Sequence, residues 1–198
     1  DQAELLAVLR RALAAAPRPE IADTSFPLHG GLVGVASYDL VRYFERLPSH
    51  ARVDDDCPEA HYIAPRSLLV FDHLTRRAAL LHAGPEHERQ GLRREVIRAL
   101  RGGLPGPAWA ASFSAPEASL SEEQFLDGVA RTKEYIAAGD VYQLVLSVRF
   151  AGRCDLDPFE TYRALRLLNP SPYMYYCDLG DRVVVGSSPE ALVKLNGS

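Results

Sequence analysis

The spacing of apolar residues along the chain predicts five helices. Residues 3–16 carry leucines at helical spacing among strong helix formers, and two prolines end the run. Residues 121–139 show one apolar stripe, which begins at a capping box of Ser121 and Gln124 and ends at Gly139, the position of a left-handed C-cap. The other predicted helices are 39–47 with Asp39 as N-cap, 86–102, and 157–168 with Asp157 as N-cap and Pro158 at the first helical position.

Shorter apolar runs bounded by turn residues predict strands. Gly30 and Gly31 permit a tight turn before a buried strand at 32–36. Two hairpins are expected, one from 67–71 and 78–82, the other from 173–179 and 182–187 around a Gly-Asp turn, and a further strand is expected at 141–150.

Two stretches lack such periodicity. Residues 49–65 contain three consecutive aspartates and two prolines and predict a loop, while 103–119, rich in Pro, Gly and Ala, predicts a linker. Because hairpins and single helices mix without regular strand–helix alternation, the predicted fold class is α+β with antiparallel or mixed sheets and packed helices. We predict a division of the chain at this linker, into residues 1–118 and residues 119–198.

The predicted strand 141–150 has an unusual distribution of side chains. One face is apolar throughout, and the other places Gln143, Ser147 and Arg149 together among valines. A solvent-facing surface and the wall of a polar cavity explain this pattern equally well. The apolar face, expected in the core, consists of Tyr142, Leu144, Leu146, Val148 and Phe150.

Composition and charge exclude several classes of protein. The chain has 198 residues, 47% of them hydrophobic, with a net charge of -4 and no long basic run, so no nucleic-acid partner is expected. No apolar stretch reaches the ~18 residues that span a bilayer, and no secretory signal is recognisable, so no membrane partner is expected. Three widely spaced cysteines fit a reducing cytoplasm, and the six histidines are interpreted as surface or loop residues with no metal-binding spacing.

No complete catalytic motif is present, but two further stretches are unusual. "NPSPYMYY" at 169–176 combines backbone-fixing prolines with aromatics around a methionine, which suits either a rigid helix-to-strand connection or an apolar ligand pocket. "GSSPE" at 186–190 is a polar cluster at a strand end, and a simple turn is the favoured interpretation.

Five segments taken together are similar to the large subunit of anthranilate synthase, a member of the chorismate-utilising enzymes. They are "GGLVGVASYDLVRYFE", "LLVFDHLT", "IAAGDVYQLVLSVRF", "LLNPSPYMYYCDLGD" and "VVVGSSPEALVKL", in the family's order and spacing from about residue 26 to 195. The segment "GVASY" departs from the family's more aromatic version, and 84–118 carries no motif.

This resemblance implies a reaction and its partners. The family's large subunit, a lyase, adds ammonia to C2 of chorismate with Mg2+ and eliminates pyruvate to give anthranilate in tryptophan biosynthesis. A glutamine amidotransferase subunit supplies the ammonia within a heterotetramer, and L-tryptophan inhibits many members. The resemblance makes 1–118 the N-terminal region of the large subunit and 119–198 the start of its chorismate-binding catalytic region. The family's metal ligands and main chorismate-handling residues are expected downstream of this chain. We therefore expect a portion of the subunit that is inactive alone.

The resemblance also nominates site residues. Gln143 falls where the related water-adding isochorismate synthases place a lysine. Since ammonia needs no general base, a glutamine that orients the nucleophile or chorismate by hydrogen bonds argues for an amine-adding enzyme. One wall of the family's tryptophan pocket is expected at Asn169, Pro172, Tyr173 and Met174.

Two alternatives remain open at this point. Component I of 4-amino-4-deoxychorismate synthase, in folate biosynthesis, shares most of these motifs and adds ammonia at C4. A fragment that serves only as a tryptophan-binding and subunit-docking module is the alternative from a different class.

Overall fold

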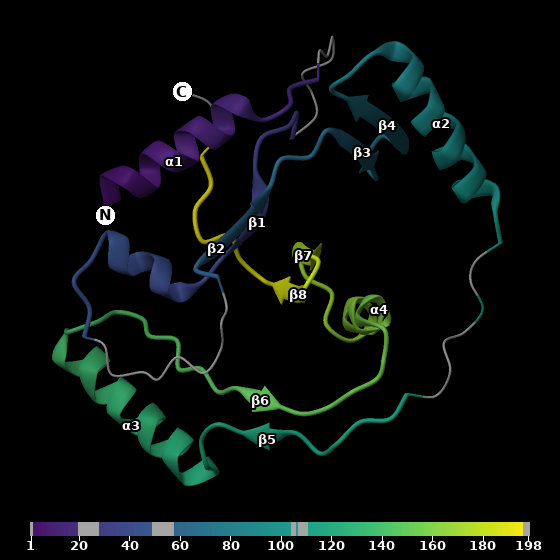
Figure 1. Ribbon diagram of the computed structural model, residues 1–198. Helices are drawn as coiled ribbons and strands as arrows, with labels where there is room; N and C mark the ends of the chain where they lie inside the picture. The colour runs from purple at the N-terminus through teal and green to yellow at the C-terminus, as the bar shows by residue number, and fades with distance from the viewer. Residues whose placement is uncertain (1, 20–27, 49–57, 104–105, 107–110, 196–198) are drawn as a thin grey trace. The chain divides into compact units, whose positions relative to one another are not determined.

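Helices and antiparallel strands follow one another in mixed order, which confirms the α+β prediction (Figure 1). The computed structural model describes residues 2–19, 28–48, 58–103, 106 and 111–195. The chain forms two compact units: unit 1 comprises Asp1–Pro105 and Cys177–Arg182, and unit 2 comprises Gly106–Tyr176 and Val183–Ser198. The functional division after residue 118 stays a prediction.

Unit 1 contains two helices, a short 3-10 helix and two antiparallel strand pairs. Strands β1 and β2 pair from Val33↔Ile63 to Ala36↔Ala60, and β3 and β4 pair from Ser67↔His82 to Asp72↔Arg77. Its elements are α1 (Gln2–Ala15), β1 (Val33–Ala36), η1 (Tyr38–Tyr43), β2 (Ala60–Ile63), β3 (Ser67–Asp72), β4 (Arg77–His82) and α2 (Glu86–Arg101).

The turn between β3 and β4 is closed by one carboxylate. Asp72 accepts hydrogen bonds from the backbone N–H of Leu74 at 2.9 Å and of Thr75 at 3.2 Å, and from the Thr75 hydroxyl. The Thr75 hydroxyl is the main reason that the pKa of Asp72 lies below its usual value. Arg76 adopts a left-handed backbone conformation with φ of 55°, which completes the reversal of the chain.

Unit 2 is built around two capped helices. The Ser121 hydroxyl accepts from the Gln124 N–H, the Gln124 side chain accepts from the Ser121 N–H, and Gly139 ends the helix with φ of 84°, so the predicted caps are confirmed. Asp157 caps the second helix through the Phe159 N–H at 2.7 Å. The elements are β5 (Glu117–Ala118), α3 (Glu122–Ala138), β6 (Phe150–Ala151), α4 (Pro158–Leu168), β7 (Tyr173–Asp178) and β8 (Val183–Ser188), with the β7–β8 turn counted in unit 1.

Three predicted elements differ in the structure. The predicted helix 39–47 is replaced by the 3-10 helix η1, which ends at Tyr43. Asp39 lies inside this helix, paired with Arg42 at 2.6 Å, so it is not an N-cap. The predicted loop 49–65 contains β2, and its first nine residues lie outside the described part of the chain. The predicted linker contains β5, and Phe113 bridges to Cys154, while 104–105 and 107–110 lie outside the described residues.

Side chains are buried at few positions. Among the described residues, only Ala16, Leu81 and His82 are buried, although many large apolar side chains remain exposed. Each sheet has two strands, a size that is marginally stable alone in water. The described elements therefore have locally well-defined ends but little shared core.

Candidate functional site

The segment 141–149, which carries Gln143, runs from the end of α3 to β6. The αL cap at Gly139 fixes its start, and Leu146 packs where α3 has Gly128, because a Cβ on Gly128 would lie 3.0 Å from the Leu146 side chain. At its far end the Arg149 N–H donates to the Ser119 hydroxyl at 3.0 Å, and the Arg149 carbonyl accepts from the Ser119 N–H at 2.8 Å. Both ends of the segment are thus anchored to α3 and to the residues that precede it.

The prediction of a continuous strand at 141–150 is wrong for this structure. Only Phe150–Ala151 form a ladder, with Glu117–Ala118 as partner. A strand requires a neighbouring strand for its backbone N–H and C=O groups, and no described residue supplies one for 141–148. The alternating pattern is therefore that of a strand, but this segment has no partner strand among the described residues.

The expected core face of this segment is also largely open. Tyr142 is 94% exposed and Phe150 63% exposed, whereas Leu146 and Val148 are half-buried. Gln143 is exposed, and its side chain makes no hydrogen bond to another described residue. The amide of Gln143 is thus available to a ligand, and its role stays a prediction.

Two unusual stretches of the sequence lie against one another. The Ser187 hydroxyl donates to the Asn169 carbonyl at 2.6 Å, and the Ser171 hydroxyl donates to the Ser188 carbonyl at 2.8 Å. These hydrogen bonds join the end of α4 to the end of β8 in opposite directions. The pattern of "GSSPE" predicts only a simple turn, and no local signal marks the two serines, because their partners lie 17 and 18 residues away.

Two of the residues nominated for the tryptophan site lie on opposite faces of strand β7. Successive side chains of a strand point to opposite faces, so Tyr173 lies on one face and Met174 on the other. Tyr176 shares the face of Met174 and packs edge-on against Phe159 of α4, with ring centroids 5.3 Å apart. Met174 is half-buried, whereas Asn169, Pro172 and Tyr173 are exposed.

Strand β8 is the neighbour of β7 in the same two-stranded sheet, and Tyr175, on the face of Tyr173, contacts it. A Cβ at Gly186 would overlap the ring of Tyr175, so this glycine leaves the space that the ring occupies. The structure therefore keeps the nominated residues on one short connection and strand. The pocket itself stays a prediction.

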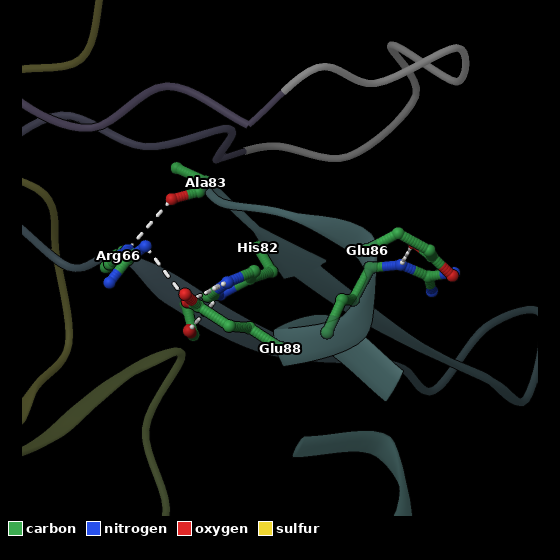
Figure 2. Close-up of polar contacts among 7 residues, drawn as sticks. Arg66, His82, Ala83, Glu86 and Glu88 are labelled. Carbon is green, nitrogen blue, oxygen red and sulfur yellow. Dashed lines mark hydrogen bonds and ion pairs between the residues drawn. The ribbon is translucent and has the colours of Figure 1, made fainter. Parts of the chain in front are cut away.

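Polar side chains also converge in unit 1, where Figure 2 shows them at the start of α2. His82 lies with its side chain only 3% exposed, Nδ1 2.9 Å from the Ser67 hydroxyl and Nε2 3.2 Å from the Glu88 carboxylate. Arg66 reaches the same carboxylate at 2.9 Å and donates to the Ala83 carbonyl at 3.0 Å. The expectation that every histidine is a surface or loop residue is therefore wrong for His82, which joins the β3–β4 hairpin to α2.

A cleft of about 690 Å³ adjoins this cluster, lined by Pro17, Arg18, His82, Ala83, Gly84, Pro85, Glu86 and Arg89. Its charged groups are largely paired: Arg89 donates to both oxygens of Glu86, and these hydrogen bonds are the main reason that the pKa of Glu86 is lowered. Because its groups are paired with one another, we interpret the cluster as a structural connection between the β3–β4 hairpin and α2.

Neither a metal-binding group of side chains nor a membrane-spanning helix is found among the described residues. No group of three or more His, Cys, Asp or Glu side chains in this part of the chain is placed to hold a metal ion, so these residues do not fit a Mg2+ centre. No helix among them is long and apolar enough to cross a membrane.

Comparison with known proteins relates the whole chain to one family. A family model described as chorismate binding enzyme matches residues 1–198. The chain is 45% identical over 174 residues to anthranilate synthase component 1 of Thermus thermophilus, covering 86% of this chain and 38% of the relative. It is 40% identical over 188 residues to the same component of Streptomyces coelicolor, covering 86% of this chain and 37% of the relative.

A solved structure shares the fold. The crystal structure of anthranilate synthase component I from Streptococcus pneumoniae TIGR4 matches 96% of this chain with a TM-score of 0.73 and 26% identity, over 45% of its own length. The chain therefore spans less than half the length of the relatives it matches. These similarities confirm the resemblance that the five sequence segments indicated.

Proposed function

The chain belongs to the chorismate binding enzyme family, and on that premise we propose that it is part of an anthranilate synthase component I. The intact protein would add ammonia to C2 of chorismate and eliminate pyruvate to give anthranilate, a lyase reaction of tryptophan biosynthesis. The observation that carries this proposal is the 35–45% identity to anthranilate synthase components over 83–97% of the chain.

Gln143 is the residue we propose to act in this reaction. Its neutral amide can donate and accept hydrogen bonds, but it cannot remove a proton from water. Ammonia in its free-amine form is already a nucleophile, so a site that only orients it needs no general base. The exposure of Gln143 and the absence of a hydrogen bond to another described side chain support a role toward a ligand.

The proposed partners follow from the component 1 designation of the relatives. A glutamine amidotransferase subunit would supply ammonia, and a heterotetramer remains the proposed assembly. We propose that Mg2+ serves the reaction through ligands outside the described residues. Chorismate is the proposed substrate.

Tryptophan inhibition is a separate part of the proposal. The connection 169–174 would supply one wall of the effector site, held by the serine hydrogen bonds from Ser171 and Ser187. Calorimetric titration of the 198-residue chain with L-tryptophan tests the docking-module alternative directly. We expect weak or no heat of binding, and strong binding would favour the alternative.

A chimera tests the proposed reaction. The matched segment of the Thermus thermophilus component 1 is replaced by this chain, and the product formed from chorismate, ammonia and Mg2+ is identified by fluorescence and mass. We expect anthranilate and pyruvate. A folded chimera that forms 4-amino-4-deoxychorismate, or no product while the parent Thermus enzyme is active, would refute the assignment.

A further inference from the structure

We propose that Gly128 and Leu146 are a pair of positioning residues for Gln143. The missing side chain at Gly128 lets Leu146 lie against α3, and this contact sets where the segment 141–149 holds the glutamine amide. The inference rests on the proposed function, because Gln143 is the residue proposed to orient the nucleophile. Neither member of the pair is a catalytic residue, since both act through Gln143.

Gly128 has no reason in its own backbone to be a glycine. It lies in the interior of α3, where glycine is less favourable than alanine because it loses more backbone freedom. Its φ is not positive, and its carbonyl accepts a hydrogen bond from the Thr132 hydroxyl of the same helix at 2.8 Å. The need for glycine therefore comes from the space beside the helix.

Leu146 occupies this space. A Cβ on Gly128 would lie 3.0 Å from Cδ2, 3.5 Å from Cδ1 and 3.9 Å from Cγ of Leu146. Carbon atoms attract one another best at about 3.5–4.0 Å, so the first of these contacts would be repulsive. Because both methyl groups lie within 3.5 Å of the same point, a side chain at residue 128 would displace the Leu146 side chain as a whole.

The segment that carries Gln143 yields more easily than the helix. Helix α3 is held by its own hydrogen bonds and by caps at both ends. At the ends of the segment, the Asp140 N–H donates to a carbonyl of α3 at 3.0 Å and the Arg149 N–H donates to the Ser119 hydroxyl at 3.0 Å. The backbone between these two ends makes no hydrogen bond to another described residue, so a displacement of Leu146 is passed on to Gln143.

The expected consequence concerns the orientation of the nucleophile. A displacement of about 1 Å at a reacting group can cost about 100-fold in rate, and a contact that is too close by a few tenths of an ångström is expected to cost less. In the Thermus chimera, Gly128→Ala should therefore lower turnover at saturating chorismate by about tenfold, with the KM for chorismate within about twofold of the parent. Amide exchange in α3 should not become faster, because alanine favours the helix.

Exchanging the sizes of the two side chains tests the contact itself. Valine has no δ carbon, so Leu146→Val makes room for the methyl group of Gly128→Ala. We expect the double variant to recover turnover to within about threefold of the parent chimera and to exceed each single variant. Full turnover in Gly128→Ala, or a double variant no better than Gly128→Ala, would overturn the proposal.

Gly91 provides the matched control in a second helix. It lies in the interior of α2, and a Cβ there would meet no atom within 4 Å. Gly91→Ala should slow amide exchange in α2 by about fourfold through helix propensity alone and leave turnover unchanged. If Gly91→Ala lowers turnover as much as Gly128→Ala does, the contact with Leu146 is not the cause and the proposal is overturned.

NMR of the same chimeras separates this inference from the proposed function. The methyl resonances of Leu146 and the side-chain amide resonances of Gln143 should shift in Gly128→Ala and return towards the parent in the double variant, whether or not anthranilate forms. These shifts in a chimera that makes no anthranilate would support the positioning pair and contradict the proposed function. Unchanged Gln143 resonances in Gly128→Ala would overturn the positioning pair, even in an active chimera.

Discussion

Replacing Glu88 tests how the β3–β4 hairpin is held on α2. In Glu88→Ala, the His82 ring, 3% exposed, loses the acceptor of its Nε2, and an unsatisfied buried donor costs about 1–3 kcal/mol. Arg66, 56% exposed, returns to water and keeps its hydrogen bond to the Ala83 carbonyl, so its share is about 0–1 kcal/mol. We expect a total loss of about 1–4 kcal/mol.

The isosteric variant separates these contributions. Glu88→Gln keeps an oxygen for His82 and loses only the charge, so we expect a loss of about 1 kcal/mol. Glu86, 57% exposed and paired only with neighbouring side chains of α2, provides the control, and Glu86→Ala should cost less than about 1 kcal/mol.

Native-state amide exchange provides the assay. The Ala83 N–H, which donates to the Arg66 carbonyl at 2.8 Å, and the β3–β4 amides report opening of this hairpin locally. Equal losses for Glu88→Ala and Glu88→Gln would refute the reasoning, because the buried acceptor would then not be the important group. So would a loss for Glu86→Ala as large as that for Glu88→Ala.

Three further changes test other parts of the chain. Ser121→Ala removes the capping box of α3 and should cost about 1 kcal/mol, seen as faster exchange in the first turn of the helix; unchanged exchange there would contradict it. Asp72 has a lowered pKa in the folded chain, so its stabilisation of the β3–β4 turn is present above the usual carboxyl value of 3.8 and is lost as the pH falls through the lowered value. Thr75→Val should reduce that pH dependence in exchange of the turn amides, and an unaltered acid profile would show that the hydroxyl is not the cause. In the chimera, Gln143→Lys should leave folding intact and impair ammonia use, with water admitted as an alternative nucleophile. Unchanged ammonia-dependent turnover would place Gln143 outside the nucleophile's site.

Local signals in the sequence predicted local structure well. The capping box at Ser121, the glycine at 139 and the Asp157-Pro158 start all specify helix ends within a few residues, and the structure has each of them. Hairpins with short turns were predicted for the same reason, since β3–β4 and β7–β8 each join strands adjacent in sequence.

Features that depend on distant partners were missed or misjudged. Strand β2 has four residues between two prolines, and only its pairing with β1 makes it a strand. Residues 141–149 have the pattern of a strand, but pattern does not provide a neighbour. His82 is buried because α2 and β3 supply its partners, and neither lies beside it in the sequence.

The candidate site likewise combines features that the sequence indicates with features that only the structure reveals. Gln143 is a candidate because the related water-adding enzymes have a lysine at this position. The structure adds that the Gln143 side chain is exposed. The hydrogen bonds from Ser171 and Ser187 join two motifs that sequence analysis had treated separately. Such side-chain contacts across the fold leave no local signature in the sequence.

Chorismate turnover on mixing shows whether this chain is one part of an anthranilate synthase component I. Three samples are each supplied with chorismate, ammonia and Mg2+: the 198-residue chain, the part of the Thermus thermophilus component 1 outside the region that this chain matches, and their mixture. We expect anthranilate only from the mixture, and less of it when the chain carries Gln143→Lys. Anthranilate from the chain alone, or a stable complex that leaves chorismate unchanged, would contradict this expectation.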